Sequence, residues 1–324
     1  MRARIIGTGS YVPERVMTNV DLERMVATSD AWIVERTGIR ERRIAAPGEA
    51  CSDLGAKAAE RALKAAGLAA SDLDLILVAT CTGDYLLPST ACVVQHRIGA
   101  TRAAACDIGA VCSGFVYALS VGDAYVRTGS RYVLVVGAEV MSAIMDWSDR
   151  STCVLFGDGA GAVVLAPAAG NRGILSSHLH SDGSLWDLIC VPGGGSRHPP
   201  SEKMLTEGLQ YLKMKGNETF KVAVKTLEEG AREALAANGL SVQDLDLYVP
   251  HQANLRIIKA VAARLGLPME KVVLNMERYG NTSAASIPLA LDEAVRDGRI
   301  EDGDVVMIEA FGSGLTWGAS IIRW

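Results

Sequence analysis

The chain has 324 residues, with 49% hydrophobic and 21% charged residues, and 32 basic against 37 acidic side chains give a net charge of −5. This composition excludes a disordered chain and disfavours a dedicated nucleic-acid-binding protein. The longest central uncharged apolar stretch, residues 108–122, is too short and glycine-rich to span a membrane, and the first residues predict a strand instead of a signal peptide. Seven cysteines without a Cys-x-x-Cys pair argue against a disulfide framework or zinc ribbon. We therefore expect a cytoplasmic globular protein that contacts no membrane or nucleic acid.

In chain order, short apolar runs alternate with longer segments of helical period. The first part of the chain predicts strands at residues 3–8, 73–79, 103–108, 132–138 and 162–166, and helices at 52–66, 88–98 and 113–128. The second part predicts helices at 219–237, 255–265 and 285–296, and strands at 245–249, 304–310 and 318–323. Buried strands between helices are typical of a layered α/β fold.

An internal repeat indicates a duplicated unit. ERALKAAGLAASDLDL at 60–75 and REALAANGLSVQDLDL at 232–247 are identical at nine of sixteen positions, at an offset of 172. FGDG at 156–159 is echoed by FGSG at 311–314, and the helix after Cys112 aligns with the helix after Asn281. One such match could be chance between alanine-rich helices, but three in the same order favour duplication. We expect two halves, residues 1–170 and 171–324.

Two glycine-rich segments could suggest a dinucleotide site. In RIIGTGSYVP, Val12 stands where the third glycine of G-x-G-x-x-G belongs, and FGDGAGAVVL runs into a strand. A dinucleotide site needs a helix N-terminus to hold the pyrophosphate, and neither segment supplies one. Nucleotide binding of this kind is therefore disfavoured.

Cys112 is the candidate nucleophile. It follows a predicted strand and a turn of small residues, and it opens a long apolar helix. A helix N-terminus stabilises a thiolate, which is the reactive form of cysteine. The alternative, a buried cysteine that acts as a small apolar filler, is our interpretation of the other six.

Two further residues combine with Cys112. His251, in DLYVPHQANLRII, follows a predicted strand, and Asn281, in ERYGNTSAASIPLAL, precedes a small-residue helix start. Taken singly, each could be structural. Together they offer a nucleophile and two neutral hydrogen-bond donors at strand ends, where sites of α/β sheets assemble. The closing EAFGSGLTWG is a glycine-rich turn, which suits either a tight hairpin or a loop with backbone N–H groups near a substrate oxyanion.

These motifs resemble the β-ketoacyl-[acyl-carrier-protein] synthase III family of condensing enzymes. The resemblance spans the whole chain and includes IIGTGSYVPE, CSGFVYAL, FGDGAGAVVL, VPHQANLRII and YGNTSAAS. It implies a thiolase-like fold, with two α/β halves in a five-layered α-β-α-β-α sandwich. It also implies a homodimer that works on acyl-CoA and malonyl-acyl carrier protein without metal or other cofactor.

The resemblance also assigns roles to residues. Cys112 would carry the acyl group, His251 and Asn281 would promote decarboxylation, and Ser313 and Phe311 would support the oxyanion hole and the apolar setting. The residues expected to bind CoA are Trp32, Arg36, Arg150, Gly216, Phe220 and Asn254. Arg256, Lys221 and Lys259 would dock the acyl carrier protein, although the two lysines could equally be a solvated helix face.

The chain departs from some family members in three places. Gly109 and Val111 replace commoner alanines, and the segment at 192–214 is long and should form an extended loop by the site entrance. Leu87 stands where some members have a phenylalanine that reaches across the dimer into the partner's acyl pocket. With Met141, it predicts a pocket of different depth that accepts primers longer than acetyl. A synthase priming a polyketide or another secondary pathway, and a non-catalytic acyl-binding protein, are the alternatives.

Overall fold

The computed structural model describes residues 2–324 and contains two main β-sheets. The first sheet has the strand order β1-β7-β6-β4-β5. These strands span Arg2–Tyr11, Asp158–Ala168, Val133–Val140, Leu75–Ala79 and Ala104–Ile108, respectively. Strands β6, β4 and β5 are parallel, whereas β7 is antiparallel to both β1 and β6. β4 and most of β6 are buried and uniformly apolar, as expected for strands covered by helices on both faces.

The second sheet repeats most of this arrangement. Its order is β8-β13-β12-β11, with bounds Gly173–Ser181, Thr316–Arg323, Val305–Gly312 and Leu247–Pro250. β11 and β12 are parallel, and β13 is antiparallel to both of its neighbours, as in the first sheet. The counterpart of β5 is reduced to a parallel bridge between Tyr248 and Val272. The duplicated thiolase-like fold is confirmed, while the boundary at residue 170, which falls between β7 and β8, stays a prediction.

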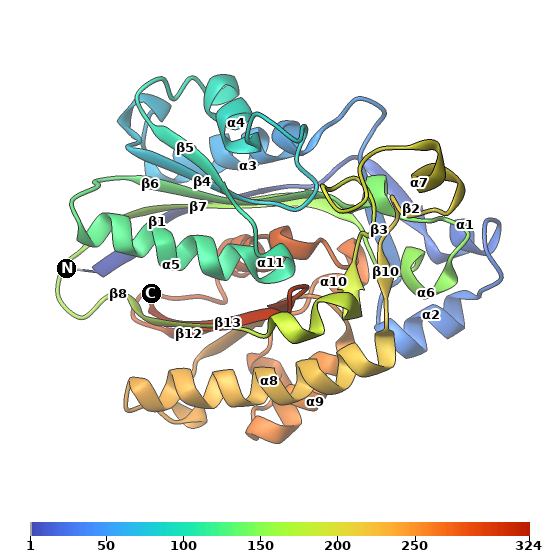
Figure 1. Cartoon of the computed structure of the whole chain (residues 1–324). Helices are drawn as coiled ribbons and strands as arrows, with labels where there is room; N and C mark the ends of the chain where they lie inside the picture. Colours follow the sequence, from blue (N-terminus) through green and yellow to red (C-terminus); the bar gives the residue numbers. More distant parts are fainter. Residues whose placement is uncertain (1) are drawn as a thin grey trace.

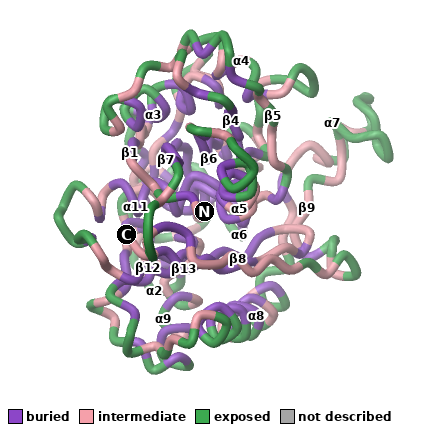
Figure 2. The backbone as a smooth tube through the Cα atoms, turned by 90° about the vertical axis from the view of Figure 1, so that its left-hand side faces the viewer, coloured by how far each residue is buried: buried purple, intermediate pink, exposed green. Residues whose placement is uncertain are grey.

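Helices separate and cover the two sheets, so that five layers are visible (Figure 1). α3 (Cys51–Ala66) and α4 (Thr90–Ile98) cover the first sheet, and α8 (Gly216–Ala237) and α9 (Leu255–Leu265) cover the second. α5 (Gly114–Arg127) and α11 (Ser286–Arg296) lie between the sheets. Apolar side chains from both sheets and both central helices form one continuous core there. The first part of α5 is mostly buried, whereas Ala124, Tyr125 and Arg127 near its end are exposed (Figure 2).

The predicted elements are confirmed with shifts of a few residues at their ends. The expected helix at 88–98 begins at Thr90, and the one at 113–128 begins at Gly114 after a 3₁₀ turn. β8 was not predicted, because Ser176, Ser177, His178 and His180 interrupt its apolar pattern. The remaining short elements are β2 (Arg15–Thr18), α1 (Asn19–Glu23), α2 (Asp30–Thr37), β3 (Glu41–Ile44), α6 (Arg150–Cys153), β9 (Ile189–Cys190), α7 (Glu202–Thr206), β10 (Lys213–Met214) and α10 (Met276–Tyr279).

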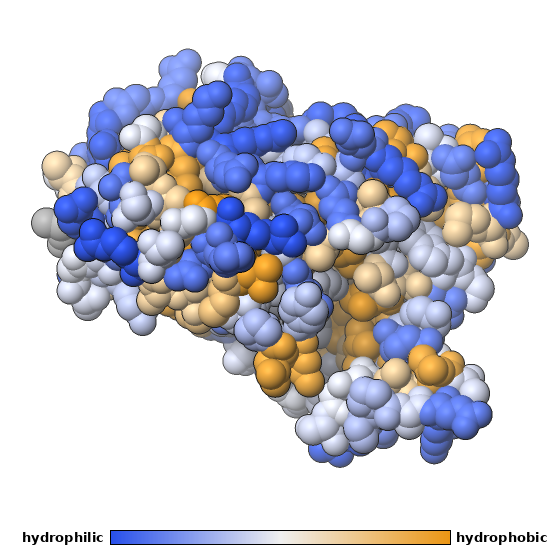
Figure 3. All heavy atoms as spheres, turned by 90° about the horizontal axis from the view of Figure 1, so that it is seen from above, coloured by the Kyte–Doolittle hydropathy of each residue, from blue (hydrophilic) through white to orange (hydrophobic). Residues whose placement is uncertain are grey.

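The surface shows two general features. The segment at 192–214 carries α7 and β10 and stands away from the body of the molecule, as Figure 2 shows for α7. Seen from the α3 and α4 side, the surface is mainly hydrophilic, with scattered apolar groups (Figure 3). Within residues 2–324, no helix combines the length and apolar character needed to cross a bilayer.

Candidate active site

Cys112, His251, Asn281 and Phe311 line one cavity of about 570 Å³. Cys112 comes from the first half of the chain and the other three from the second half. Cys112 follows β5, and His251 follows β11 directly. Phe311 lies near the end of β12, and Asn281 lies in the loop between α10 and α11. The sequence prediction that these residues meet is therefore consistent with their placement. Their catalytic roles remain predictions.

The backbone around Cys112 is tightly fixed. Cys112 lies in a 3₁₀ turn, Val111–Ser113, that leads directly into α5. Val111 has φ +45°, which is a strained conformation for a β-branched residue. A Cβ atom added at Gly312 would lie 2.8 Å from the Cys112 backbone nitrogen. The end of β12 can therefore approach this turn so closely only because residue 312 is a glycine. The two halves of the chain thus meet directly at the thiol.

The expected stabilisation of a Cys112 thiolate is not the dominant effect in the ligand-free chain. Cys112 is at the predicted helix start, but only 9% of its surface is exposed. Burial raises its pKa to about 12, the Ser283 hydroxyl offsets part of that rise, and the Glu139 carboxylate adds to it. A backbone hydrogen bond at the start of the helix does lower the pKa of the thiol, as expected, but desolvation of the charged form outweighs it here.

His251 is held as a neutral imidazole. It is buried, and burial lowers its pKa to about 3. Its backbone N–H donates to the Glu309 carbonyl at 2.7 Å, and Nδ1 lies 2.6 Å from Ser286 Oγ. Ser286 Oγ also accepts the Gln252 N–H at 3.3 Å, so its own proton is free to go to Nδ1. This arrangement favours the tautomer with its proton on Nε2.

Asn281 is fixed through both backbone and side chain. Its N–H donates to the Leu155 carbonyl at 2.8 Å, and its carbonyl accepts the Gly157 N–H at 3.0 Å. Its side-chain Oδ1 accepts the Ser283 N–H at 2.8 Å. With Oδ1 occupied by this bond, the Nδ2 group is the part of the amide that remains to donate toward a ligand.

Aromatic and basic residues surround the outer part of the cavity. Trp32, Arg36, Gly216, Phe220 and Asn254 line it. The guanidinium carbons of Arg36 and Arg150 lie 4.8 and 4.6 Å from the Trp32 ring centroid, respectively. Asn254 accepts the Arg256 N–H as the N-cap of α9 and donates to the Arg36 carbonyl. Cationic and aromatic groups in this arrangement suit phosphates and a flat heterocycle.

The residues predicted to dock the carrier protein and to form the acyl pocket differ in whether they line the cavity. Arg256 and Lys221 line the cavity, and Arg256 lies over the Phe220 ring at 5.6 Å, whereas Lys259 is exposed on α9 outside the lining. Met141 is buried and lines the cavity.

Three predicted residues are not among those that line the cavity. Arg150 is exposed next to Trp32. Ser313 donates its hydroxyl proton to the Ile189 carbonyl. Leu87 is 78% exposed and is absent from the lining within this chain.

Several lining or supporting residues were not predicted from the sequence. Ser286 contacts His251, Ser283 contacts Asn281, and the buried Glu139 contacts Ser283. SAAS after Asn281 was a visible signal for the two serines, because hydroxyls at a helix start bond nearby groups. For Glu139, the sequence shows only an acidic residue near the end of an apolar strand, which does not indicate a contact with the site.

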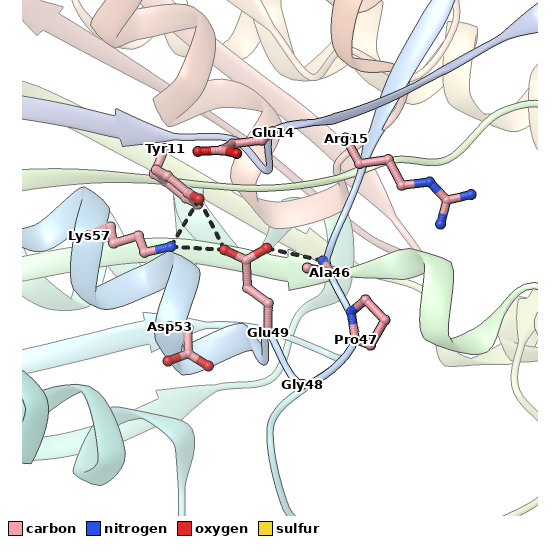
Figure 4. Close-up of a pocket in the computed structure, with 9 residues that line it drawn as sticks. All are labelled: Tyr11, Glu14, Arg15, Ala46, Pro47, Gly48, Glu49, Asp53 and Lys57. Atoms are coloured by element: carbon pink, nitrogen blue, oxygen red, sulfur yellow. Dashed lines mark hydrogen bonds and ion pairs between the residues drawn. The ribbon is translucent and has the colours of Figure 1, made fainter.

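A second depression of about 780 Å³ is separate from this cavity (Figure 4). The Lys57 ammonium there contacts Tyr11 Oη and Glu49 Oε1, each at 2.9 Å, and Ala46 N–H donates to the same Glu49 carboxylate. The Lys57 ammonium and the Glu49 carboxylate thus satisfy one another, and none of the predicted site residues lines the depression. Among residues 2–324, no cluster of three His, Cys, Asp or Glu side chains could hold a metal ion.

The comparisons with known proteins agree with the resemblance. Residues 106–183 match the family described as 3-oxoacyl-[acyl-carrier-protein (ACP)] synthase III, and residues 235–324 match its C-terminal region. A β-ketoacyl-[acyl-carrier-protein] synthase III of Alkalilimnicola ehrlichii is 56% identical, and the match covers 99% of each chain.

Solved structures give the same result. The 3-oxoacyl-[acyl-carrier-protein] synthase III of Aquifex aeolicus is 48% identical with a TM-score of 0.92, covering 99% of this chain and 100% of that chain. The priming β-ketosynthase of the R1128 polyketide pathway is 38% identical with a TM-score of 0.92, covering 99% and 96%. The chain belongs to the β-ketoacyl-[acyl-carrier-protein] synthase III family.

Proposed function

We propose that the protein catalyses the decarboxylating Claisen condensation of an acyl-CoA primer with malonyl-acyl carrier protein, giving a 3-oxoacyl-acyl carrier protein that starts fatty acid synthesis. The observation that supports this best is the meeting of Cys112, His251 and Asn281 in one cavity. A non-catalytic acyl-binding protein would not require a nucleophile beside two neutral donors. The relatives at 52–56% identity favour fatty acid synthesis over the polyketide alternative.

In the first half-reaction, Cys112 Sγ attacks the acyl-CoA carbonyl. The new Cys–acyl thioester forms as the carbon–sulfur bond to CoA breaks, and the thiol proton ends on the released CoA. The backbone N–H groups of Cys112 and Ser313 hold the oxyanion. Since burial raises the pKa of Cys112 to about 12, the proton must leave as attack occurs, and acylation should accelerate with pH.

In the second half-reaction, malonyl-acyl carrier protein replaces CoA. His251 Nε2–H and Asn281 Nδ2–H donate to its thioester carbonyl, which gains negative charge as CO₂ leaves and the enolate forms. Because both donors are neutral, they strengthen with the developing charge and do not pair with the carboxylate in the ground state. Phe311, which is buried beside His251, gives the departing carboxylate an apolar setting. The enolate carbon attacks the acyl-Cys112 carbonyl, and the freed sulfur takes up a proton.

The outer residues bind the carriers. We assign CoA binding to Trp32, Arg36, Arg150, Gly216, Phe220 and Asn254, with adenine stacked on Trp32 and the arginines near phosphates. Arg256, Lys221 and Lys259 form a local basic face that docks the acidic carrier protein. The two reacting thioesters supply the chemistry, so no metal or other cofactor is proposed, and the reaction takes place in the cytoplasm.

A homodimer is supported by two exposed features of the first half. β5 is an edge strand of its sheet, with one side unpaired within this chain. Tyr85, Leu86 and Leu87 are 65%, 92% and 78% exposed, which is unusual for three consecutive apolar side chains. A second copy placed against β5 would cover them, and its Leu87 together with Met141 would form an acyl pocket that accepts primers longer than acetyl.

Steady-state kinetics test this function. The protein is expected to make 3-oxoacyl-acyl carrier protein from malonyl-acyl carrier protein and a panel of acyl-CoAs, with ping-pong kinetics. Octanoyl- or branched acyl-CoA should react measurably beside acetyl-CoA. Absence of the condensation product with every primer would refute the function, and activity with acetyl-CoA alone would refute the pocket assignment.

A further inference from the structure

Glu139, near the end of β6, is an unusual buried acid that the reaction above does not use. Its side chain is fully buried, and no basic group of residues 2–324 forms a hydrogen bond or ion pair with it. Instead, its two carboxylate oxygens accept hydrogen bonds from two segments: the loop after β4, and the turn after Asn281. A buried carboxylate needs such donors to remain in place.

The loop after β4 supplies most of the donors. Glu139 Oε2 accepts from the Thr80 hydroxyl at 3.1 Å and from the Thr82 N–H at 3.1 Å, and it also contacts the Thr82 hydroxyl. The Cys81 N–H contacts both oxygens, at 3.2 and 3.1 Å. Burial raises the pKa of Glu139, and these donors oppose that rise. The carboxylate therefore has a fixed position relative to the first sheet.

Across the interface between the halves, Glu139 Oε1 accepts the Ser283 hydroxyl at 3.0 Å. Ser283 has φ +49°, a conformation that a serine does not adopt without external support. In that conformation its N–H donates to Asn281 Oδ1 at 2.8 Å. Ala284, the residue after Ser283, also packs closely against β6. A Cβ atom added at Gly137 of that strand would lie 2.3 Å from the Ala284 carbonyl oxygen.

We propose that Glu139 is a positioning residue of this site: it holds Ser283 in its strained conformation, and Ser283 in turn orients the Asn281 amide toward the malonyl thioester. The proposal rests on the proposed function, since it assigns the positioning to the decarboxylation step. The link crosses from the first half to the second, so correct docking of the halves is required for a competent Asn281. A misplacement of about 1 Å in a reacting group can cost on the order of 100-fold in rate.

The experiment measures conversion of malonyl- to acetyl-acyl carrier protein by mass spectrometry, with Cys112→Ala as the reference protein. Using that background removes any effect of Ser283 or Glu139 on the thiol itself. Adding Ser283→Ala should lower the decarboxylation rate about 10- to 100-fold. Glu139→Gln keeps the shape but leaves one acceptor oxygen where two are needed, and it should cause a loss in the same direction.

Ser10→Ala is the matched control. Ser10 Oγ donates to Asp292 Oδ2 at 2.6 Å, so it is also a serine–carboxylate bond between the two halves, but it lies outside the cavity. This variant should decarboxylate within about twofold of the reference, as expected for a change remote from the reacting groups.

A double-mutant cycle separates positioning from general destabilisation. If Ser283 acts through Asn281, then Ser283→Ala should cause no further loss in a protein that already carries Asn281→Ala. Additive losses, equal losses in Ser283→Ala and Ser10→Ala, or unchanged decarboxylation in both Ser283→Ala and Glu139→Gln would each overturn the inference. If the unmodified protein does not condense and the reference protein does not decarboxylate malonyl-acyl carrier protein, the proposed function fails instead.

Discussion

On the proposed mechanism, the Ser286 hydroxyl favours the His251 tautomer with its proton on Nε2, and we predict that removal of this hydroxyl slows decarboxylation selectively. Ser286 Oγ lies 2.6 Å from Nδ1 of a buried, neutral imidazole. In Ser286→Ala, Nδ1 loses this partner, and the tautomer with its proton on Nδ1 is no longer disfavoured. That tautomer has no proton on Nε2 to donate to the thioester carbonyl.

The size of the effect follows from the lost hydrogen bond. Leaving a buried acceptor unsatisfied costs about 1–3 kcal/mol, and each 1.36 kcal/mol is a tenfold change, so the rate should fall about 5- to 150-fold. Decarboxylation of malonyl-acyl carrier protein in a Cys112→Ala background measures this step alone, and ¹⁵N NMR of the histidine reports the tautomer directly.

A control separates this effect from a loss of stability. Ser177 Oγ pairs with Ser320 Oγ at 2.7 Å in the second sheet, outside the cavity, and Ser177→Ala should leave the rate within about twofold. If Ser286→Ala decarboxylates as fast as its reference, or if its NMR spectrum shows the Nε2-protonated tautomer undisturbed, the reasoning about Ser286 is refuted.

Three other predictions follow from the same geometry. Burial lowers the pKa of His251 to about 3 from 6.5, so between these pH values the unfolded chain binds a proton that the folded chain does not. The free energy of unfolding should therefore fall as pH drops from about 6.5 toward 3. Urea titrations should show a weaker fall for His251→Gln. Because burial raises the Cys112 pKa to about 12, its alkylation rate should still rise with pH above about 10, and a plateau near pH 8 would contradict this. Gly312→Ala places a Cβ atom 2.8 Å from the Cys112 backbone nitrogen. Acyl transfer should therefore slow about 10- to 100-fold, and thermal melting should show about 1–3 kcal/mol of destabilisation. Acylation of this variant at the wild-type rate would contradict the close approach.

Much of the fold was predictable because its strands and helices are strongly patterned. β4 and most of β6 are apolar, and Gly67 and Gly266 end helices α3 and α9 in the left-handed conformation. β8 escaped prediction because it carries serines and histidines, and its place in the sheet depends on pairing with β13. The paired residues of β8 and β13 are 135 to 150 positions apart, and such pairing is a tertiary effect that local patterns do not contain.

The site was predictable where residue type and position coincide, as for Cys112 at a helix start and His251 after a strand. The raised pKa of Cys112 was not predictable, because burial depends on the β12 end that closes over the turn. The Glu139–Ser283 bond joins residues 144 positions apart, and neither residue type signals it. Sequence reasoning thus predicted residues that the structure places around one cavity, and it missed Ser286 and Ser283, which contact them, and Glu139, which contacts Ser283.

A single-turnover mass measurement shows directly whether Cys112 carries the acyl group between the two half-reactions. The protein is incubated with an acyl-CoA and freed from excess CoA. One portion is then digested for mass spectrometry, and a second, undigested portion is mixed with malonyl-acyl carrier protein. The acyl mass should be found on the peptide containing Cys112 and should disappear as 3-oxoacyl-acyl carrier protein forms, and Cys112→Ala should gain no acyl mass. Acyl mass retained by Cys112→Ala, or an acyl group on Cys112 that malonyl-acyl carrier protein does not remove, would contradict this role of Cys112.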